Sequence, residues 1–280
     1  ISLYRLLYRN VSRLLVNNAC MLLCGGFIML TRLSMAKGLD KALRQFAIVV
    51  ISAALAWLVP YIMERVWQLY KLQWVYAGAG LLILLVVWAA GNESFGAQLS
   101  LTIAGVSIQP SEFVKLTFVF FVASMFYQST DFKTIFLTTA VAGAHVLVLV
   151  LSKDLGSALI FFVTYLLLLF VATGRWVYLI TGSALGTGAA LAAYQLFDHV
   201  RRRVAAWSNP WADIENKGYQ ITQSLFAIGT GGWFGMGLCQ GMPGKIPVVE
   251  KDFIFSAVSE EMGAIFAICV LLICLGCFIQ

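Results

Sequence analysis

The feature that most constrains the fold is a series of long apolar segments, each near the length that crosses a lipid bilayer. The hydrocarbon core of a bilayer takes about 20 residues of α-helix. Eight segments approach this length: about 16–33, 46–63, 72–90, 110–127, 135–151, 155–173, 177–197 and 253–279. Because backbone polar groups in hydrocarbon must be satisfied within their own segment, such segments fold as helices. The sequence therefore predicts an all-α, multi-pass membrane protein with about eight transmembrane helices.

The composition excludes an ordinary soluble domain. Of the 280 residues, 61% are hydrophobic and 11% are charged, whereas soluble domains carry roughly 25% charged residues. The formal net charge of +6 is typical of Lys and Arg that flank membrane spans. The sequence has no basic stripe interleaved with exposed aromatic residues, so it gives no indication of nucleic-acid binding. The six cysteines show no zinc-site spacing, and we expect most of them to pack as small apolar side chains.

We expect a single membrane-embedded domain over residues 1–280, with two segments outside the spans. Residues 1–15 carry Arg5, Arg9 and Arg13 at four-residue spacing, which predicts a basic amphipathic helix on an anionic membrane surface. Residues 198–251 form a long loop between the seventh and eighth spans. The chain starts at Ile1 and stops after an apolar run, which we interpret as a truncation at the C-terminus.

The segment Gly218–Gly263 differs from the rest because little of it is a plain apolar helix. Gln220, Gln223 and Ser224 fall on one helical face with apolar residues opposite, which predicts a short amphipathic helix. A glycine-rich stretch follows, from Gly229 to Gly244. Irregular backbone at membrane depth survives only where it lines a cavity or packs on protein. We therefore expect the glycine-rich stretch either to line a cavity or to pack on protein.

One acid, Asp252, stands directly before the apolar run 253–255. A carboxylate at the entrance of a membrane helix is costly unless it is solvated, paired or used. A helix cap and a catalytic group explain its position equally well. On a helix that begins at Asp252, Ser256 points in nearly the same direction. The adjacent acids Glu260 and Glu261 need partners inside the span, and Arg203 and Lys245 are the candidates.

Three further charged positions invite both a structural and a functional interpretation. Glu112 and Lys115 lie three residues apart at the start of the fourth span, so they can pair on one helical face or meet a substrate. Asp154 is favoured as the cap of the sixth span. The basic cluster ending at Arg203 serves either as a headgroup anchor or as a phosphate clamp. Alternation of the spans places the loops of Glu112, Asp154 and Asp252 on one side, whereas the positive-inside count does not decide the orientation.

Together these residues resemble the SEDS family of bacterial membrane proteins, which includes RodA, FtsW and SpoVE. The resemblance runs from about residue 16 to the end of the chain. The matching pieces, in order, are Gly96-Ala97-Gln98, Gln109-Pro110-Ser111-Glu112 with Lys115, Asp154-Leu155-Gly156, Arg203 with Pro210, Gly218-Tyr219-Gln220 with Gln223-Ser224, Ala227-Ile228-Gly229-Thr230-Gly231-Gly232, and Asp252-Phe253-Ile254-Phe255 with Glu260-Glu261-Met262-Gly263.

The chain departs from the family pattern at several points. The family has ten spans, so the last two would be missing here. Leu99-Ser100-Leu101 stands where the family usually has a Trp shortly after its Gly-Ala pair. Lys153 replaces the usual Pro before Asp-Leu-Gly, and Lys251 replaces the frequent Thr or Ser before the catalytic Asp. None of these changes removes a residue that we regard as essential.

The resemblance implies a peptidoglycan glycosyltransferase that polymerises lipid II on the outer face of the bacterial cytoplasmic membrane, with the long loop outside the cell. By resemblance Asp252 is the general base that activates the acceptor hydroxyl. We assign Arg203, Lys115 and Lys245 to the diphosphate, with Glu112 holding Lys115 in place. The remaining residues assigned to substrate binding are Gln220, Gln223, Ser224 and Ser256.

The resemblance also bears on cofactors and partners. A divalent cation, Mg²⁺ or Mn²⁺, would stabilise the leaving diphosphate, its ligands being unknown, and no organic cofactor is expected. The expected partners are lipid II, a class B penicillin-binding protein that crosslinks the strands, and other cell-wall synthesis proteins, with no nucleic acid. Two alternatives stay open: a lipid II flippase or other transporter, and a non-catalytic scaffold of the cell-wall machinery.

Overall fold

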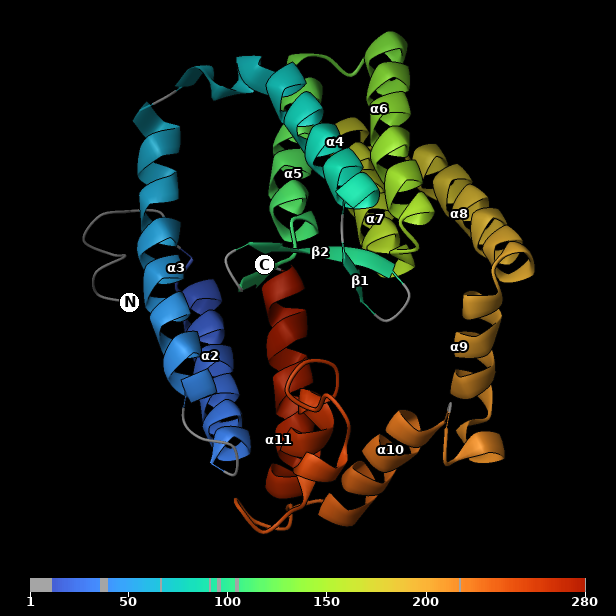
Figure 1. Ribbon diagram of the computed structural model, residues 1–280. Coiled ribbons are helices and arrows are strands. Elements are labelled where there is room, and N and C mark those ends of the chain that lie inside the picture. Colours follow the sequence, from blue (N-terminus) through green and yellow to red (C-terminus); the bar gives the residue numbers. More distant parts are fainter. Residues whose placement is uncertain are drawn as a thin grey trace. The chain divides into compact units, whose positions relative to one another are not determined.

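The computed structural model describes residues 12–35, 40–65, 67–90, 92–94, 97–103, 106–216 and 218–279, and these are mostly helical (Figure 1). Residues 1–11 of the expected basic helix, and Gly96 of the first family motif, lie outside the described residues. The chain groups into two compact units. The terminal unit holds the segments up to Tyr61 and from Tyr194 onward, and the central unit holds Ile62–Ala193.

The central unit is built on helices that pack around one apolar core. They are η1 (Trp67–Leu72), α4 (Gln73–Ala90), α5 (Ser111–Gln128), α6 (Phe132–Leu151), α7 (Leu155–Thr173) and most of α8 (Trp176–Leu196). α4 packs on α5 and α6, and α7 packs on the same two helices. The side chains of Phe118, Phe121 and Phe161 are fully buried between them. Among these aromatic rings lies His145, a buried residue that no local sequence pattern singled out.

The segment between α4 and α5, expected to be a polar loop, contains three short strands. These are β1 (Asn92–Ser94), β2 (Ala97–Ile103) and β3 (Val106–Ile108). They form an antiparallel sheet in the order β1-β2-β3. The sequence of β2, Ala-Gln-Leu-Ser-Leu-Thr-Ile, alternates polar and apolar residues, which is the period of a strand. This alternation was a readable signal that the loop interpretation overlooked.

The terminal unit contains the two N-terminal helices and everything that follows α8. Its elements are α2 (Arg13–Ser34), most of α3 (Asp40–Arg65), α9 (Asp198–Ser208), η2 (Pro210–Asp213), α10 (Tyr219–Gly231), η3 (Pro243–Lys245) and α11 (Ile254–Ile279). α11 packs against both α2 and α10. The long loop is therefore largely helical, and the expected amphipathic helix is confirmed as α10.

Among the residues that the structure describes, six helical segments are long and apolar enough to cross a membrane. They are Arg13–Ser34, Leu69–Ala89, Phe132–Leu151, Leu155–Thr173, Trp176–Leu196 and Ile254–Ile279. The two other expected spans are also helical, within α3 and α5. The apolar part of α3 is shorter, Ala42–Ala56, and α5 carries Glu112 and Lys115 near its start. The multi-pass architecture is thus confirmed, and the count of eight spans stays a prediction.

α11 is broken in its middle, which the apolar pattern of this segment does not predict. Gly263 has φ 86° and ψ 168°, a conformation outside the helical region. The break leaves carbonyl groups before it and N–H groups after it without partners in their own helix. The backbone of the glycine-rich stretch takes both sets: Met236 N–H to Glu260 O (2.9 Å), Gly237 N–H to Glu261 O (3.0 Å), Ala264 N–H to Gly232 O (2.9 Å) and Ile265 N–H to Trp233 O (3.3 Å).

Glycines allow this contact because the two backbones approach more closely than a side chain permits. A Cβ atom on Gly231 would lie 2.1 Å from the carbonyl oxygen of Ser259, and one on Gly235 would lie 2.4 Å from that of Glu261. Gly235 also has a φ of 80°, which strains any residue with a Cβ. The expectation that the glycine-rich stretch packs on protein is confirmed. We call residues 232–246, which wrap against α11, the glycine-rich loop.

Gly231→Ala is expected to destabilise the protein. Its Cβ would overlap the backbone of α11, and overpacking of this kind costs about 1–3 kcal/mol. Gly229→Ala is the matched control, since it lies in the same helix and a Cβ atom at that position would have nothing within 4 Å. Thermal unfolding in detergent should show a lower midpoint for Gly231→Ala and an unchanged or higher midpoint for Gly229→Ala. Equal midpoints would contradict the close packing of α10 on α11.

Candidate functional site

Asp252 lies in a turn that leads into α11, two residues before the first helical residue, Ile254. Its side chain is exposed. In the described part of the chain, no hydrogen bond or ion pair occupies its carboxylate. The residue directly before the helix is Phe253, so the interpretation of Asp252 as the cap of α11 is not supported. The carboxylate is instead free for a ligand or a proton.

The turn that carries Asp252 is strained. Val248 has a φ of 55°, and a β-branched residue rarely adopts a positive φ. The backbone N–H groups of Lys251 and Asp252 both donate to the carbonyl oxygen of Val248, at 3.0 Å and 3.2 Å. Strain of this kind gathers at functional sites, where the surrounding structure holds it in place. This turn therefore fixes the backbone of Asp252 just before the N-terminus of α11.

An apolar groove lies directly beside this turn. It has a volume of about 620 Å³ and runs between α2, α3 and the start of α11. Glu250 and Ile254, which flank Asp252 in sequence, line one part of it. The other lining residues are Ala19, Leu22, Leu23, Gly26, Phe27, Leu30, Gln45 and Val49. A long apolar chain in this groove would bring its polar end close to Asp252.

A second, smaller cavity lies between α10, the glycine-rich loop and α11. Its volume is about 270 Å³. Two residues expected in the site, Gln223 and Lys245, line it. The remaining lining residues are Phe226, Ala227, Thr230, Met236, Gln240, Met242, Ile246 and Glu260. We call this space the loop cavity.

The adjacent acids Glu260 and Glu261 are both buried, 6% and 2% exposed. Arg32 of α2 donates from Nε to Oε1 of Glu261 at 3.0 Å and from a terminal guanidinium nitrogen to the carbonyl oxygen of Gly241 at 3.2 Å. Oε1 of Glu260 accepts the backbone N–H of Met242 at 2.8 Å. Both acids thus hold the glycine-rich loop against α11.

The prediction that Arg203 or Lys245 pairs with these acids was wrong. Arg203 and Lys245 are exposed and form no ion pair with another described residue. The cation that pairs with Glu261 is Arg32, which lies 229 residues earlier in the chain. No local pattern links positions so far apart. The only sequence signal was that Arg32 lies at the end of an apolar span, where a charge needs an explanation.

Ser224 of α10 and Ser256 of α11 lie next to each other at the contact between the two helices. Their hydroxyl oxygens are 2.5 Å apart, and both side chains are buried. This hydrogen bond ties α10 to the first half of α11. Gln220, one turn before Ser224 on α10, is half-buried. A direct substrate contact by Ser224, Ser256 or Gln220 stays a prediction.

In the central unit, two expectations about charged residues are confirmed. Nζ of Lys115 lies 2.8 Å and 2.9 Å from the two carboxylate oxygens of Glu112. Oδ1 of Asp154 accepts the backbone N–H of Ser157 at 3.1 Å, so Asp154 caps α7. Both features stand at helix N-termini, where negative charge is favourable. That these residues share a membrane side with Asp252 stays a prediction.

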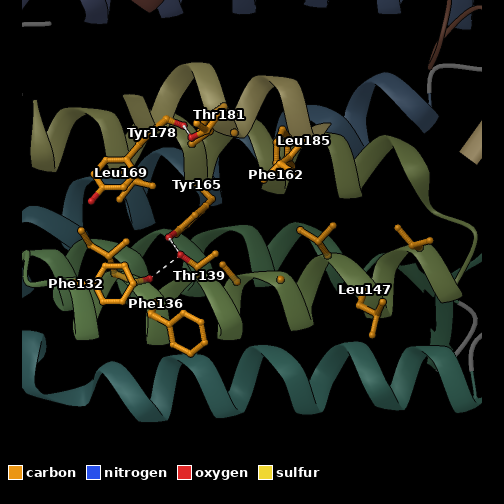
Figure 2. Close-up of a pocket in the computed structure, with 17 residues that line it drawn as sticks. Phe132, Phe136, Thr139, Leu147, Phe162, Tyr165, Leu169, Tyr178, Thr181 and Leu185 are labelled. Atoms are coloured by element: carbon orange, nitrogen blue, oxygen red, sulfur yellow. Dashed lines mark hydrogen bonds between the residues drawn. The ribbon is translucent and has the colours of Figure 1, made fainter. Parts of the chain in front are cut away.

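The central unit also contains a groove of its own, between α6, α7 and α8 (Figure 2). Its volume is about 480 Å³. Figure 2 shows the hydroxyl groups of Thr139 and Tyr165 turned toward each other, and their oxygens are 2.6 Å apart. The other labelled side chains are apolar apart from Tyr178 and Thr181. None of the residues assigned to the site from the sequence lines this groove.

Arg203 lies on α9 and has an exposed side chain. Its neighbour Arg201 forms an ion pair with Asp198 on the same helix. Arg203 has no such partner among the described residues. Its guanidinium is therefore available to an anion, as the phosphate-clamp interpretation requires.

Comparison with known proteins places these features in context. The FtsW, RodA and SpoVE family of cell cycle proteins matches residues 13–280. The peptidoglycan glycosyltransferase RodA of Mycobacterium tuberculosis is 34% identical over 223 residues, covering 71% of this chain and 46% of the relative. The stage V sporulation protein E of Bacillus subtilis is 31% identical over 200 residues, covering 69% and 55%. The chain thus spans about half the length of the curated relatives it matches.

Solved structures agree with this similarity. A chain from a peptidoglycan synthase complex that coordinates polymerization and crosslinking superposes with a TM-score of 0.75 at 25% identity, over 95% of this chain and 75% of that chain. The rod shape determining protein RodA of Thermus thermophilus superposes with a TM-score of 0.60 at 22% identity, over 92% and 70%. The second likeness concerns the fold alone.

Arg32→Met should destabilise the terminal unit strongly. Removal of one partner of a buried ion pair costs about 3–5 kcal/mol, because it leaves an uncompensated charge. The double variant Arg32→Met with Glu261→Met removes both charges and should recover much of the loss. Arg201→Met, which breaks an exposed pair, should cost only about 0–1 kcal/mol. Thermal unfolding midpoints in detergent measure all three, and a double variant no better than Arg32→Met would contradict the pairing.

Proposed function

Because this chain belongs to the FtsW, RodA and SpoVE family of cell cycle proteins, we propose that it is a multi-pass peptidoglycan glycosyltransferase of the cytoplasmic membrane. It would polymerise lipid II on the outer face of the membrane. The observation that carries the proposal is the exposed, unpaired carboxylate of Asp252 beside an apolar groove. Relatives that match this chain are named peptidoglycan glycosyltransferases, which supports the same activity.

The proposed reaction needs a base and a stable leaving group. An acceptor sugar hydroxyl attacks the anomeric carbon of the lipid-linked glycan, and the bond from that carbon to the diphosphate oxygen breaks. The electron pair of that bond leaves with the diphosphate. The proton of the hydroxyl goes to the carboxylate of Asp252, and general-base catalysis of this kind contributes about 10²–10⁴-fold. The polyprenyl tail would occupy the groove between α2, α3 and α11.

The diphosphate requires positive charge around it. We assign this role to Arg203 of the terminal unit. The support is its exposed side chain and its lack of an ion pair with another described residue. The roles expected for Lys245 and for Lys115, with Glu112 orienting Lys115, stay predictions from the sequence.

A divalent cation, Mg²⁺ or Mn²⁺, fits the proposal only as part of the substrate complex. The described residues contain no group of three or more His, Cys, Asp or Glu side chains that could hold a metal ion. Mg²⁺ often needs only one or two carboxylates together with substrate phosphates. Because Asp252 is assigned to the proton, the cation would be held mainly by the substrate phosphates, where it would neutralise charge on the leaving diphosphate.

The proposed partner is a class B penicillin-binding protein that crosslinks the new strands, along with other cell-wall synthesis proteins. Support comes from the structural likeness to a chain of a synthase complex that coordinates polymerization and crosslinking. Helices of both units carry exposed apolar side chains that could serve such contacts. No residue of this chain is assigned to the interface.

A second candidate function is transport of lipid II across the membrane. The broken helix α11, with buried acids next to the break, is the feature that favours it, because transporters build midplane sites from discontinuous helices. Transport does not require a proton acceptor at Asp252, so the two functions separate in an assay of polymerisation.

Asp252→Asn should abolish polymerisation of lipid II by the complete protein while leaving it folded. Asparagine keeps the shape of the side chain but cannot take a proton, so the rate should fall by about 10²–10⁴-fold. Glu215→Gln, an exposed acid outside the site, serves as the matched control and should keep the parent rate. The assay follows glycan strands on gels, in detergent with Mg²⁺ or Mn²⁺ and the partner transpeptidase. Parent-like polymerisation by Asp252→Asn would remove Asp252 from the mechanism.

A further inference from the structure

The loop cavity plays no part in the proton transfer, yet a buried carboxylate forms part of its wall. Glu260 is 6% exposed, and its Oε1 already accepts the N–H of Met242. Its Oε2 is buried and has no hydrogen-bond partner among the described residues. A buried polar atom without a partner costs about 1–3 kcal/mol, and more when it is charged. Because Glu260 lines the loop cavity, its unsatisfied oxygen points to a ligand that donates a hydrogen bond.

The charges around the loop cavity favour a neutral ligand. Glu260 contributes one negative charge and Lys245 one positive charge, and the other polar side chains are the neutral Gln223, Gln240 and Thr230. A phosphate in this space would face the carboxylate of Glu260, and an amine would face the ammonium of Lys245. A neutral group with both hydrogen-bond donors and acceptors meets neither repulsion.

The volume of the loop cavity and its apolar side chains restrict the class of ligand further. The cavity volume of about 270 Å³ lies just below the roughly 300 Å³ at which pockets for drug-sized ligands begin. Phe226, Met236 and Met242 add apolar side chains to the polar groups that line the cavity. A sugar ring has hydroxyl groups at its edge and C–H groups on its face, so it matches a cavity with both kinds of wall. A polyprenyl tail would leave the carboxylate unsatisfied.

We propose that the loop cavity binds one N-acetylated sugar ring of the glycan substrate, with Oε2 of Glu260 accepting a hydrogen bond from a hydroxyl or amide N–H. The inference rests on the proposed function, which supplies the sugar. Glu260 lies six residues after Ile254 on α11, roughly 9 Å further along the helix axis. The ring in the cavity is therefore not the ring whose hydroxyl Asp252 deprotonates. Glu260 would hold a neighbouring ring and so set the register of the strand.

The direct test measures binding of di-N-acetylchitobiose, a neutral disaccharide, to the complete protein in detergent by saturation-transfer NMR. Glu260→Gln keeps an oxygen for the N–H of Met242 but places an amide donor at the Oε2 position. Because a hydrogen bond to a charged group is lost, the dissociation constant should rise about tenfold or more. Gln240→Ala truncates an exposed side chain of the cavity, cannot disturb the buried acids, and should also weaken binding. Glu215→Gln is the matched control and should bind like the parent.

Three results would overturn the inference. The first is that the parent does not bind the sugar. The second is that the parent, Glu260→Gln and Gln240→Ala bind it with equal dissociation constants. The third is that inorganic diphosphate displaces the sugar, which would make the cavity an anion site.

Polymerisation kinetics distinguish this inference from the proposed function. An active parent whose Glu260→Gln variant has a raised KM and a nearly unchanged kcat supports both. An active parent whose variant has an unchanged KM contradicts the sugar site and leaves the proposed function intact. A parent that binds the sugar through Glu260 but never polymerises lipid II contradicts the proposed function alone.

Discussion

The terminal unit depends on the backbone hydrogen bonds between the glycine-rich loop and the break in α11. A helix interrupted at Gly263 would leave polar backbone groups bare in an apolar environment, where each costs several kcal/mol. The loop supplies partners on both sides of the break, and it approaches closely enough only because glycines face the helix. Arg32 and the two buried glutamates hold the same loop through further hydrogen bonds.

This arrangement makes the first half of α11 a short rigid element with different chemistry at its two ends. The exposed carboxylate of Asp252 stands before its first residue, beside the apolar groove. The buried acids Glu260 and Glu261 stand near its last residue, and Glu260 lines the loop cavity. Ser256 fixes this element to α10 through Ser224. The distance between the two ends is therefore set by the helix itself, which is consistent with the proposed binding of successive sugar rings in register.

Local sequence patterns predicted most of the helices and part of the site. Apolar segments of membrane length marked the spans. The three-residue spacing identified the pair Glu112–Lys115, and the preference for Asp at a helix start identified the cap at Asp154. Asp252 was identified because a carboxylate before an apolar run needs an explanation. The strand β2 carried an alternating pattern that was readable but was taken for a loop.

Two features could not be predicted because they depend on contacts between distant residues. The pairing of Arg32 with Glu261 joins positions 229 residues apart, and nothing near either residue specifies the other. In the sequence, Gly263 is one glycine within an apolar span. Only the structure shows that the helix breaks there and that the glycine-rich loop supplies hydrogen-bond partners for the freed backbone groups. The loop cavity follows from both features, so its carboxylate could not be assigned a role from the sequence.

The most direct test of a substrate site in the terminal unit is photocrosslinking with lipid II that carries a photoreactive group on its sugar. After irradiation of the complete protein in membranes, mass spectrometry identifies the labelled peptides. We expect the label within residues 218–262, on α10, the glycine-rich loop or the first half of α11, with loss of label when unmodified lipid II competes. Label confined to the groove between α6, α7 and α8 (Figure 2) would contradict the assignment of the substrate site to Asp252 and its surroundings.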